Sequence, residues 1–287
     1  MATIRNPIEW ALDELKLSAL ALRLTGRAVR GTQEGSAASS LTVRRIALAD
    51  LRNALARGFD DFGAFRTDVV FLVIVYPLAG LVLARLAFDQ DMLPLLFPLA
   101  SGFALIGPVA AVGLYEMSRR REQGLEVTWG SAFGMIGSPS FGAILVLGLL
   151  LLVIFLLWLG TAQAIYMLTL GPEPPVSLSA FINDVFTTAA GWSMVILGVG
   201  VGFLFAAAVL AISVVSFPLL LDRDVGLGKA VAISVRSVMA NPGPMALWGL
   251  IVAGGLVIGT IPLFLGLIVI LPVLGHGTWH LYRKVVR

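Results

Sequence analysis

The sequence contains no cysteine and only two histidines, His276 and His280. Without cysteine the chain has no disulfide, thiolate zinc site, iron–sulfur cluster or cysteine nucleophile. Charged residues make up only 13% of the 287 residues, whereas soluble domains carry about 25%. The hydrophobic share is 58%, which is more than a soluble globule of this length hides behind a polar exterior. The composition therefore predicts an all-α membrane protein whose solvent is the lipid bilayer.

The first 40 residues lack the central apolar run and the small-residue cleavage site of a signal peptide. We interpret residues 1–40 as a variable cytoplasmic arm that ends in a small, polar linker. An interfacial segment follows at 41–68, with an amphipathic helix expected over about 42–58. Such a helix either lies on an anionic membrane face or packs on other parts of the same protein. Its apolar stripe consists of Val43, Ala47, Leu51, Leu55 and Phe59.

The transmembrane domain is expected over residues 69–287. A helix that crosses the bilayer needs roughly 20 apolar residues, and the apolar segments of this length predict a six-helix transmembrane bundle. The last two spans form one apolar stretch that is too long for a single crossing, and Pro262 predicts a tight turn between them. The six spans lie at about 69–88, 93–116, 141–169, 192–221, 245–262 and 263–282.

Lysine and arginine are absent from the segments that we expect outside the cell, namely 89–92, 170–191 and the turn near Pro262. The opposite ends of the spans are rich in arginine. By the positive-inside rule, we expect both termini in the cytoplasm. The net charge of +3 follows from this sorting. We therefore expect the lipid bilayer as a partner and no nucleic acid.

The even-numbered spans each carry a proline before their cytoplasmic end, at Pro108, Pro218 and Pro272. Aligning Pro108 with Pro272 places Glu116 opposite His280, and a short amphipathic segment precedes each odd-numbered span. This pattern suggests three repeats of an elbow helix plus a helical hairpin. Since proline kinks a membrane helix, three kinks at one depth would open a polar vestibule. The alternative is that proline is simply frequent in membrane helices.

Small residues recur at four-residue spacing in two of the expected spans, at Gly198 and Gly202 and at Gly255 and Gly259. Such spacing lets neighbouring helices approach closely. We expect these glycines to serve helix packing within the monomer, and the alternative is a dimer seam. Besides the bilayer, the partners to expect are another membrane protein or further copies of the chain in a homo-oligomer.

Ionisable residues near the inner boundary are the candidate functional site, because burying a charge in a membrane is expensive. They form a candidate polar cluster of Glu116, Asp222, Arg223, Asp224, His276 and His280. The alternative is that they are interfacial anchors and salt-bridge partners.

The two histidines lie four residues apart and share one helix face. The segment HGTWH lacks the glutamate of the HExxH zinc-protease motif, and two histidines on one face cannot be both axial ligands of a haem. We therefore predict no metal, no cofactor and no catalytic residue. Instead, we expect a hydrogen-bonded cluster of the histidines with Glu116 or Asp222. Trp279, between them, is typical of an aromatic belt at the membrane interface.

Two stretches, SFPLLLDRDVGLGKAVAISVRSVMANPGPMALWGL and LPVLGHGTWHLYRK, carry a family resemblance. Over roughly residues 41–287 the chain resembles the bacterial integral-membrane family known as domain of unknown function 2189. The resemblance implies a location in the bacterial inner membrane and no established activity. Some members are labelled as cytochrome oxidase components, but two histidines cannot ligate two haems and a copper. The matching residues are Phe217, Pro218, Leu221, Asp222, Arg223, Asp224, Asn241, Pro242, Trp248, Gly275, His276, Trp279 and His280.

The leading functional hypothesis is non-enzymatic: the protein handles a small solute or a lipid at a cytoplasmic polar vestibule. The alternative is an accessory or assembly subunit that docks on a larger membrane complex, for example a respiratory one. A metal-dependent membrane enzyme is a weaker third class. Solute handling predicts a cavity lined by the polar residues, whereas docking predicts a contiguous exposed apolar patch and no cavity.

Overall fold

The computed structural model describes residues 41–73, 81, 85 and 93–287. Over these residues the protein is all-helical, apart from one isolated bridge between Val43 and Val286. The all-α prediction is therefore confirmed for this part of the chain. The arm 1–40, most of the expected first span 69–88 and the loop 89–92 lie outside the described residues.

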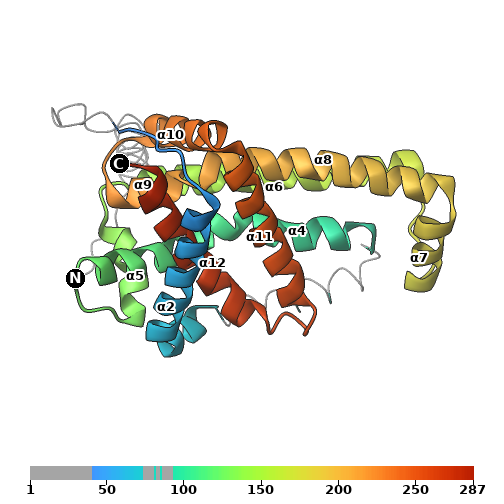
Figure 1. The fold of residues 1–287 in the computed structure, drawn as a ribbon. Helices are drawn as coiled ribbons and strands as arrows, with labels where there is room; N and C mark the ends of the chain where they lie inside the picture. The colour runs from blue at the N-terminus through green and yellow to red at the C-terminus, as the bar shows by residue number, and fades with distance from the viewer. Residues whose placement is uncertain (1–40, 74–80, 82–84, 86–92) are drawn as a thin grey trace, which may run out of the picture.

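Two long helices dominate the molecule and lie side by side along the length of Figure 1. They are α6 (Phe141–Thr169) and α8 (Ala189–Ser213). The short helix α7 (Leu178–Thr187) lies across their far end. A turn, η1 (Leu93–Leu95), leads into α4 (Leu96–Ala110), which packs along α6. The helix α6 has the bounds expected for the third span.

The α6–α8 hairpin exposes apolar side chains over most of its length. Leu149 of α6 is 61% exposed and Phe203 of α8 is 69% exposed. A helix that is apolar on all sides requires a protein core or lipid around it. These helices support a membrane protein, whereas the six crossings stay a prediction. By length and composition, three helices of the described chain are able to cross a membrane: Phe141–Thr169, Ala189–Asp222 and Pro242–Thr260.

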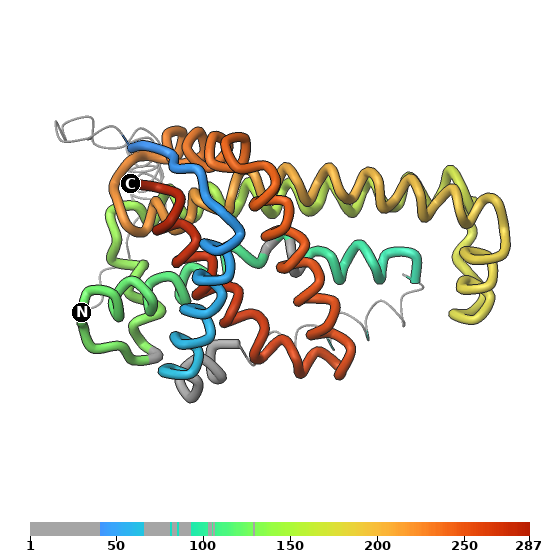
Figure 2. The backbone as a smooth tube through the Cα atoms, in the orientation of Figure 1, coloured from blue at the N-terminus to red at the C-terminus, as the bar shows by residue number. Residues whose placement is uncertain are grey.

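The opposite end of the hairpin, which we call the basic end, carries arginines at positions 119–121, 223 and 283. Shorter helices gather here beside the C-terminus (Figure 1). Figure 2 shows that the chain returns to this end several times, so residues distant in sequence become neighbours. The helices are α5 (Val112–Glu122), η2 (Trp129–Gly137), α9 (Ser216–Asp222) and α10 (Leu227–Ala240).

The final hairpin consists of α11 (Pro242–Thr260) and α12 (Leu267–Val285). The turn between them lies where Pro262 predicted it, and Leu263 and Phe264 adopt positive φ angles of 51° and 66° there. Next to this hairpin, the helix α2 (Leu48–Val73) packs along α12.

The amphipathic helix begins at Leu48 rather than near residue 42, because the segment before it is extended against the C-terminus. The Arg44 N–H donates to the Val285 carbonyl at 2.8 Å. In the helix itself, Leu51 of the apolar stripe is buried against the rest of the protein, whereas Phe59 remains exposed. Packing on the same protein therefore accounts for part of the stripe.

The three prolines occupy different settings. Pro108 lies near the end of α4, just before the break at Ala111. Pro218 lies in α9, shortly after the break that separates α8 from α9, as expected because a proline removes the bond to residue i−4. Pro272 lies inside α12, which is continuous. Short helices, η2 and α10, precede α6 and α11, but the threefold repeat stays a prediction.

Three of the four spaced glycines lie at helix contacts. A Cβ atom on Gly202 would lie 3.0 Å from the Trp158 ring. Gly255 and Gly259 face side chains of α12 and of the residues around its start, whereas Gly198 has no neighbouring atom within 4 Å of such a Cβ position among the described residues. The glycines of the fifth span therefore lie at the contact between α11 and α12.

Candidate functional site

The two histidines lie on the part of α12 that α2 and α5 cover, and their exposed fractions are 0% for His276 and 6% for His280. The acid beside them is Asp61 of α2, whose Oδ2 atom lies 2.9 Å from His280 Nε2. Ser118 of α5 joins the group, because its Oγ lies 2.6 Å from Asp61 Oδ2 and 2.7 Å from His276 Nδ1. Arg121 binds the other carboxylate oxygen, Asp61 Oδ1. We call these five residues the buried polar cluster.

The hydrogen bonds of the buried polar cluster assign its protons. An ionised carboxylate only accepts hydrogen bonds, so Ser118 and His280 Nε2 both donate to Asp61. Because the Ser118 hydroxyl proton is used in this way, Ser118 accepts from a proton on His276 Nδ1. The two remaining ring nitrogens, His276 Nε2 and His280 Nδ1, have no hydrogen-bond partner among the described residues.

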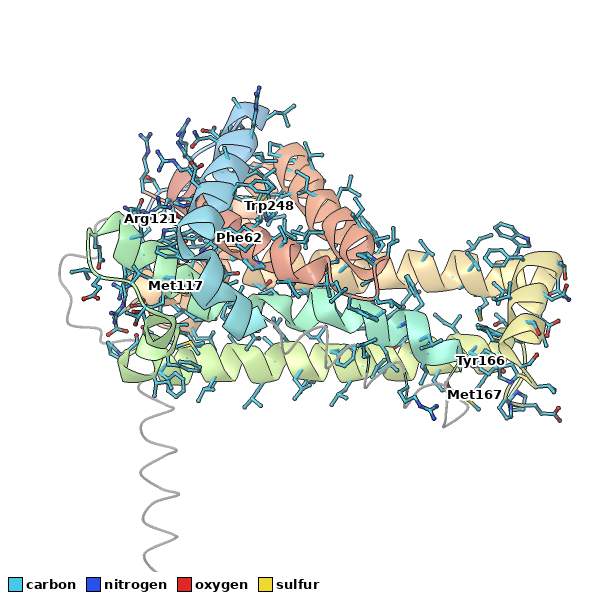
Figure 3. The ribbon with its side chains drawn as sticks, turned by 90° about the horizontal axis from the view of Figure 1, so that it is seen from below. Phe62, Met117, Arg121, Tyr166, Met167 and Trp248 are labelled. Carbon is cyan, nitrogen blue, oxygen red and sulfur yellow. The ribbon has the colours of Figure 1, made fainter. Side chains whose placement is uncertain are left out.

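The environment of Asp61 favours its ionised form. Burial raises the pKa of Asp61, but the hydrogen bonds from His280 and Ser118 and the nearby histidine charges outweigh burial and lower this pKa from 3.8 to about 2. The Arg121 guanidinium also packs over the Phe65 ring at 5.6 Å from its centroid. Figure 3 shows Arg121 and Met117 of α5 beside Phe62 of α2, at the basic end.

Close backbone contact between α2 and α12 builds the cluster. A Cβ atom on Gly58 would lie 2.6 Å from the Val273 carbonyl oxygen and 2.8 Å from the Gly277 nitrogen. Real Cβ atoms do not approach backbone atoms so closely, so a residue without a side chain is required here. One helical turn after Gly58, the same face of α2 presents Asp61 to the histidines.

The expected partners of the histidines, Glu116 and Asp222, are not the observed ones. Both acids have other partners, and Asp61 takes the place predicted for them. Asp61, Ser118 and Arg121 were not among the residues predicted for this site. One feature of the sequence points to Asp61, because it continues the spacing of the buried positions of α2. An acid on the buried face of a helix needs a partner.

The buried polar cluster has the composition of a serine–histidine–acid triad but not its accessibility. Ser118 is 1% exposed, so its hydroxyl is closed off from any substrate. No group of three or more His, Cys, Asp or Glu side chains in the described part of the chain is arranged to hold a metal ion. The hydrogen bonds of the cluster join α2, α5 and α12.

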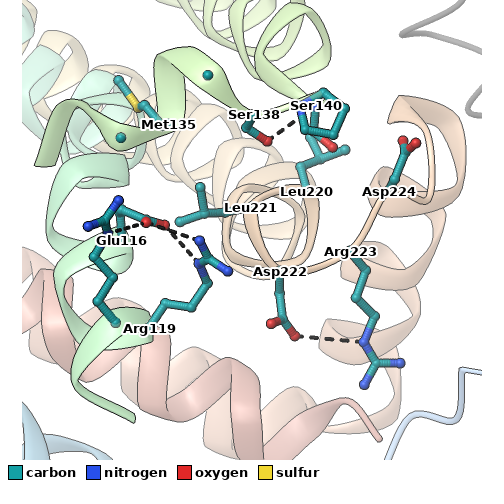
Figure 4. Close-up of a pocket in the computed structure, with 14 residues that line it drawn as sticks. Glu116, Arg119, Met135, Ser138, Ser140, Leu220, Leu221, Asp222, Arg223 and Asp224 are labelled. Atoms are coloured by element: carbon teal, nitrogen blue, oxygen red, sulfur yellow. Dashed lines mark hydrogen bonds and ion pairs between the residues drawn. The ribbon is translucent and has the colours of Figure 1, made fainter. Parts of the chain in front are cut away.

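A second polar site is an open pocket of about 400 Å³ at the basic end, which we call the arginine pocket. Figure 4 shows it between α5, the η2–α6 junction and α9. Four of the six predicted candidates line it, and the two histidines do not. Its lining consists of Glu116, Arg119, Arg120, Gly134, Met135, Gly137, Ser138, Pro139, Ser140, Leu220, Leu221, Asp222, Arg223 and Asp224.

Glu116 is the buried charge of the arginine pocket, with an exposed fraction of 1%. Arg119 binds both of its oxygens, through Nε at 2.8 Å and Nη2 at 3.0 Å, and Arg120 Nε donates to Oε1 at 2.8 Å. These partners lie three and four residues along α5, on the same helix face. The hydrogen bond to Glu116 is also the main cause that raises the pKa of Arg119.

Asp222 ends α9 and ties the pocket to the last turns of α12. The Tyr282 hydroxyl donates to Asp222 Oδ2 at 2.6 Å, and Arg283 Nη1 lies 3.4 Å from the same oxygen. Trp279, expected in an aromatic belt, is instead fully buried. It packs against the Tyr282 ring, and its Nε1–H donates to Glu122 Oε2 at 3.3 Å, because α5 and α9 cover this face of α12.

The comparisons with known proteins concern the middle of the chain. No curated protein and no solved structure matches the sequence. A family model matches residues 96–222, which run from the start of α4 to the end of α9. This segment contains Glu116 and Asp222, but neither α2 nor the two histidines. The family resemblance is thus confirmed for residues 96–222, which match the family described as a predicted integral membrane protein (DUF2189).

Proposed function

We propose that the protein handles a small polar solute or a lipid head group at the arginine pocket, without catalysing a reaction. One observation carries this proposal: Glu116, Asp222, Arg223 and Asp224, which were selected for their charge near the membrane boundary, line a single open pocket. Ligand pockets of proteins combine a few polar groups with apolar walls. Here Leu220 and Leu221 supply part of the apolar wall.

The position of the pocket supports a ligand that comes from the membrane or its surface. The pocket includes Ser138 and Ser140, immediately before α6, and the last residues of α9. Both helices continue into the apolar hairpin. A lipid head group in the pocket would therefore leave its acyl chains beside exposed leucines of α6, such as Leu145.

The proposal includes the membrane topology, with six crossings, both termini in the cytoplasm and the basic end at the cytoplasmic face of a bacterial inner membrane. The charge distribution supports it, because the far end of the hairpin, 170–191, contains no lysine or arginine. Reporter fusions after residues 180 and 287 should give an external and a cytoplasmic signal, respectively. A cytoplasmic signal after residue 180 would exclude this topology.

The alternative role is an accessory or assembly subunit. It requires an exposed apolar face whose exposure is not accounted for by contact with lipid. The exposed apolar side chains of α6 and α8 are those that a lipid-facing hairpin needs, so they do not favour this role over the first. The pocket favours solute or head-group handling.

Cysteine protection tests the proposal, since the chain has no cysteine of its own. Ser138→Cys places a thiol in the pocket, and Ala56→Cys places one on the exposed face of α2 as a control. We expect the polar lipid extract or the metabolite extract of the expression host to slow maleimide labelling of Ser138→Cys severalfold and to leave Ala56→Cys unchanged. Equal labelling of Ser138→Cys with and without both extracts would contradict the proposal.

A further inference from the structure

The helix α7, at the end of the hairpin opposite the basic end, has two chemically different faces. At about 100° per residue, its apolar side chains form one continuous arc, and Asn183, Asp184 and Thr187 lie on the other side. The arc consists of Phe181, Val185, Leu178, Ile182 and Phe186.

Only one edge of this arc is used for packing inside the protein. Val185 is buried, and the Phe181 ring packs against the Tyr166 ring of α6, with centroids 6.4 Å apart. The other edge is an exposed stripe of three side chains, Leu178, Ile182 and Phe186, which are 42%, 48% and 59% exposed.

The exposed stripe turns back toward the membrane-spanning helices rather than away from them. The Phe186 ring meets the edge of the Trp192 ring, with centroids 6.3 Å apart. Trp192 lies in the first turn of α8, and its Nε1–H donates to the Phe186 carbonyl at 3.1 Å. A tryptophan with an apolar body and a satisfied polar tip is typical of the membrane–water interface.

The length of α6 places α7 at the depth of the lipid head groups. With 29 residues and about 1.5 Å of rise per residue, α6 is about 44 Å long. A bilayer including both head-group regions measures about 40–45 Å. Figures 1 and 3 agree that α7 lies across the end of the hairpin, at a steep angle to α6 and α8. If the basic end lies at one interface, α7 therefore lies at the other.

We infer that α7 is an interfacial helix that rests in the head-group region of the leaflet opposite the basic end, with Leu178, Ile182 and Phe186 in contact with lipid. Lipid is the occupant of the stripe because the stripe is continuous with the apolar surface of the hairpin, where Leu168 is 86% exposed. The helix also carries no cation, so its contact is apolar rather than electrostatic. Such a contact fixes the depth of the hairpin in the bilayer, independently of what the arginine pocket binds.

Spin labels on two neighbouring residues test this inference on the full chain. Ile182→Cys lies on the stripe and Asn183→Cys on the polar face, and both positions are exposed, which makes them a matched pair. The labelled proteins are placed in nanodiscs of phosphatidylcholine and phosphatidylglycerol. We expect the label at 182 to collide mainly with oxygen, which concentrates in lipid, and the label at 183 to collide mainly with a water-soluble nickel chelate.

Two results would overturn the inference. Equal and high accessibility of both labels to the nickel chelate would place the stripe in water. Low accessibility of the label at 182 to both reagents would show that protein, rather than lipid, covers it. The pair Phe186→Cys and Thr187→Cys repeats the measurement one turn later, in case the first substitution disturbs α7.

Discussion

The basic end and the α6–α8 hairpin are stabilised by different interactions. At the basic end, side-chain hydrogen bonds join residues far apart in the chain, and Asp61 and His280 are separated by 219 positions. In the hairpin, many of the side-chain hydrogen bonds run to a carbonyl one turn earlier on the same helix, as in Thr161 to Leu157 and Ser193 to Ala189. The hairpin thus satisfies its polar groups locally, which is the requirement of a helix in lipid.

This difference shows which contacts fix the positions of the helices relative to one another. In the hairpin, lipid replaces a protein core, and a few contacts such as the Trp158 indole on Ser101 Oγ, at 2.9 Å, join neighbouring helices. At the basic end, lipid contact does not replace the buried Asp61 carboxylate, which accepts hydrogen bonds from Ser118 and His280. Changes at the basic end should therefore cost much more stability than changes in the hairpin.

The largest effect is expected for Asp61→Ala. The substitution leaves Ser118, Arg121 and His280 without their shared acceptor, and removing one partner of a buried ionic group costs about 3–5 kcal/mol. We expect a large drop in the midpoint of thermal unfolding in detergent. Asp60→Ala is the control, because Asp60 is the exposed neighbour on the same helix. Similar midpoints for the two variants would show that the cluster does not hold the basic end together.

Low pH should remove the contribution of the ionised Asp61 carboxylate to the stability of the unsubstituted protein. The pKa of Asp61 is lowered from 3.8 to about 2 in the folded protein, so its contribution is complete above pH 4 and is lost as the pH falls toward 2. The lowered pKa corresponds to about 2 kcal/mol. We expect the stability difference between the native protein and Asp61→Asn to be constant from pH 7 to pH 5 and to shrink below pH 4. A difference that already shrinks between pH 7 and pH 5 would assign the effect to another group.

A methyl group between α2 and α12 should have the next largest effect. Gly58→Ala forces the Cβ atom onto backbone atoms of α12, and such overpacking costs about 1–3 kcal/mol. Gly63→Ala, on the same helix, meets no described atom within 4 Å and should stabilise the helix by about 0.5–1 kcal/mol. Opposite signs of the two changes in thermal unfolding are the expected result. A loss of stability in both variants would mean that the tight contact is not specific to Gly58.

The smallest effect is expected in the hairpin. Gly202→Ala places a methyl group 3.0 Å from the Trp158 ring, whereas Gly198→Ala meets no described atom within 4 Å. Both gain helix propensity, and we expect Gly202→Ala to be less stable than Gly198→Ala by under about 1 kcal/mol. Thermal unfolding in nanodiscs measures this difference. A cost at Gly202 as large as that of Asp61→Ala would contradict the contrast between the two regions.

The sequence was sufficient for features that depend on neighbouring residues. Hydropathy gave the helical, membrane class and the bounds of α6, and Pro262 marked the turn before α12. Charge near the membrane boundary selected four residues of the arginine pocket. The pairing of Glu116 with Arg119 and Arg120 also follows a local spacing, although Glu116 or Asp222 was expected beside the histidines.

Only the tertiary structure decided which helices meet. The periodicity of α2 showed that one face is apolar, but it does not tell whether lipid or another helix covers that face, because both are apolar surroundings. The choice of α12 as its partner depends on Gly58, which allows backbone contact with Gly277, on a helix more than two hundred residues away. This contact placed Asp61, rather than Glu116 or Asp222, beside His280, and it also enclosed Trp279, because a residue's burial is set by the helices packed around it.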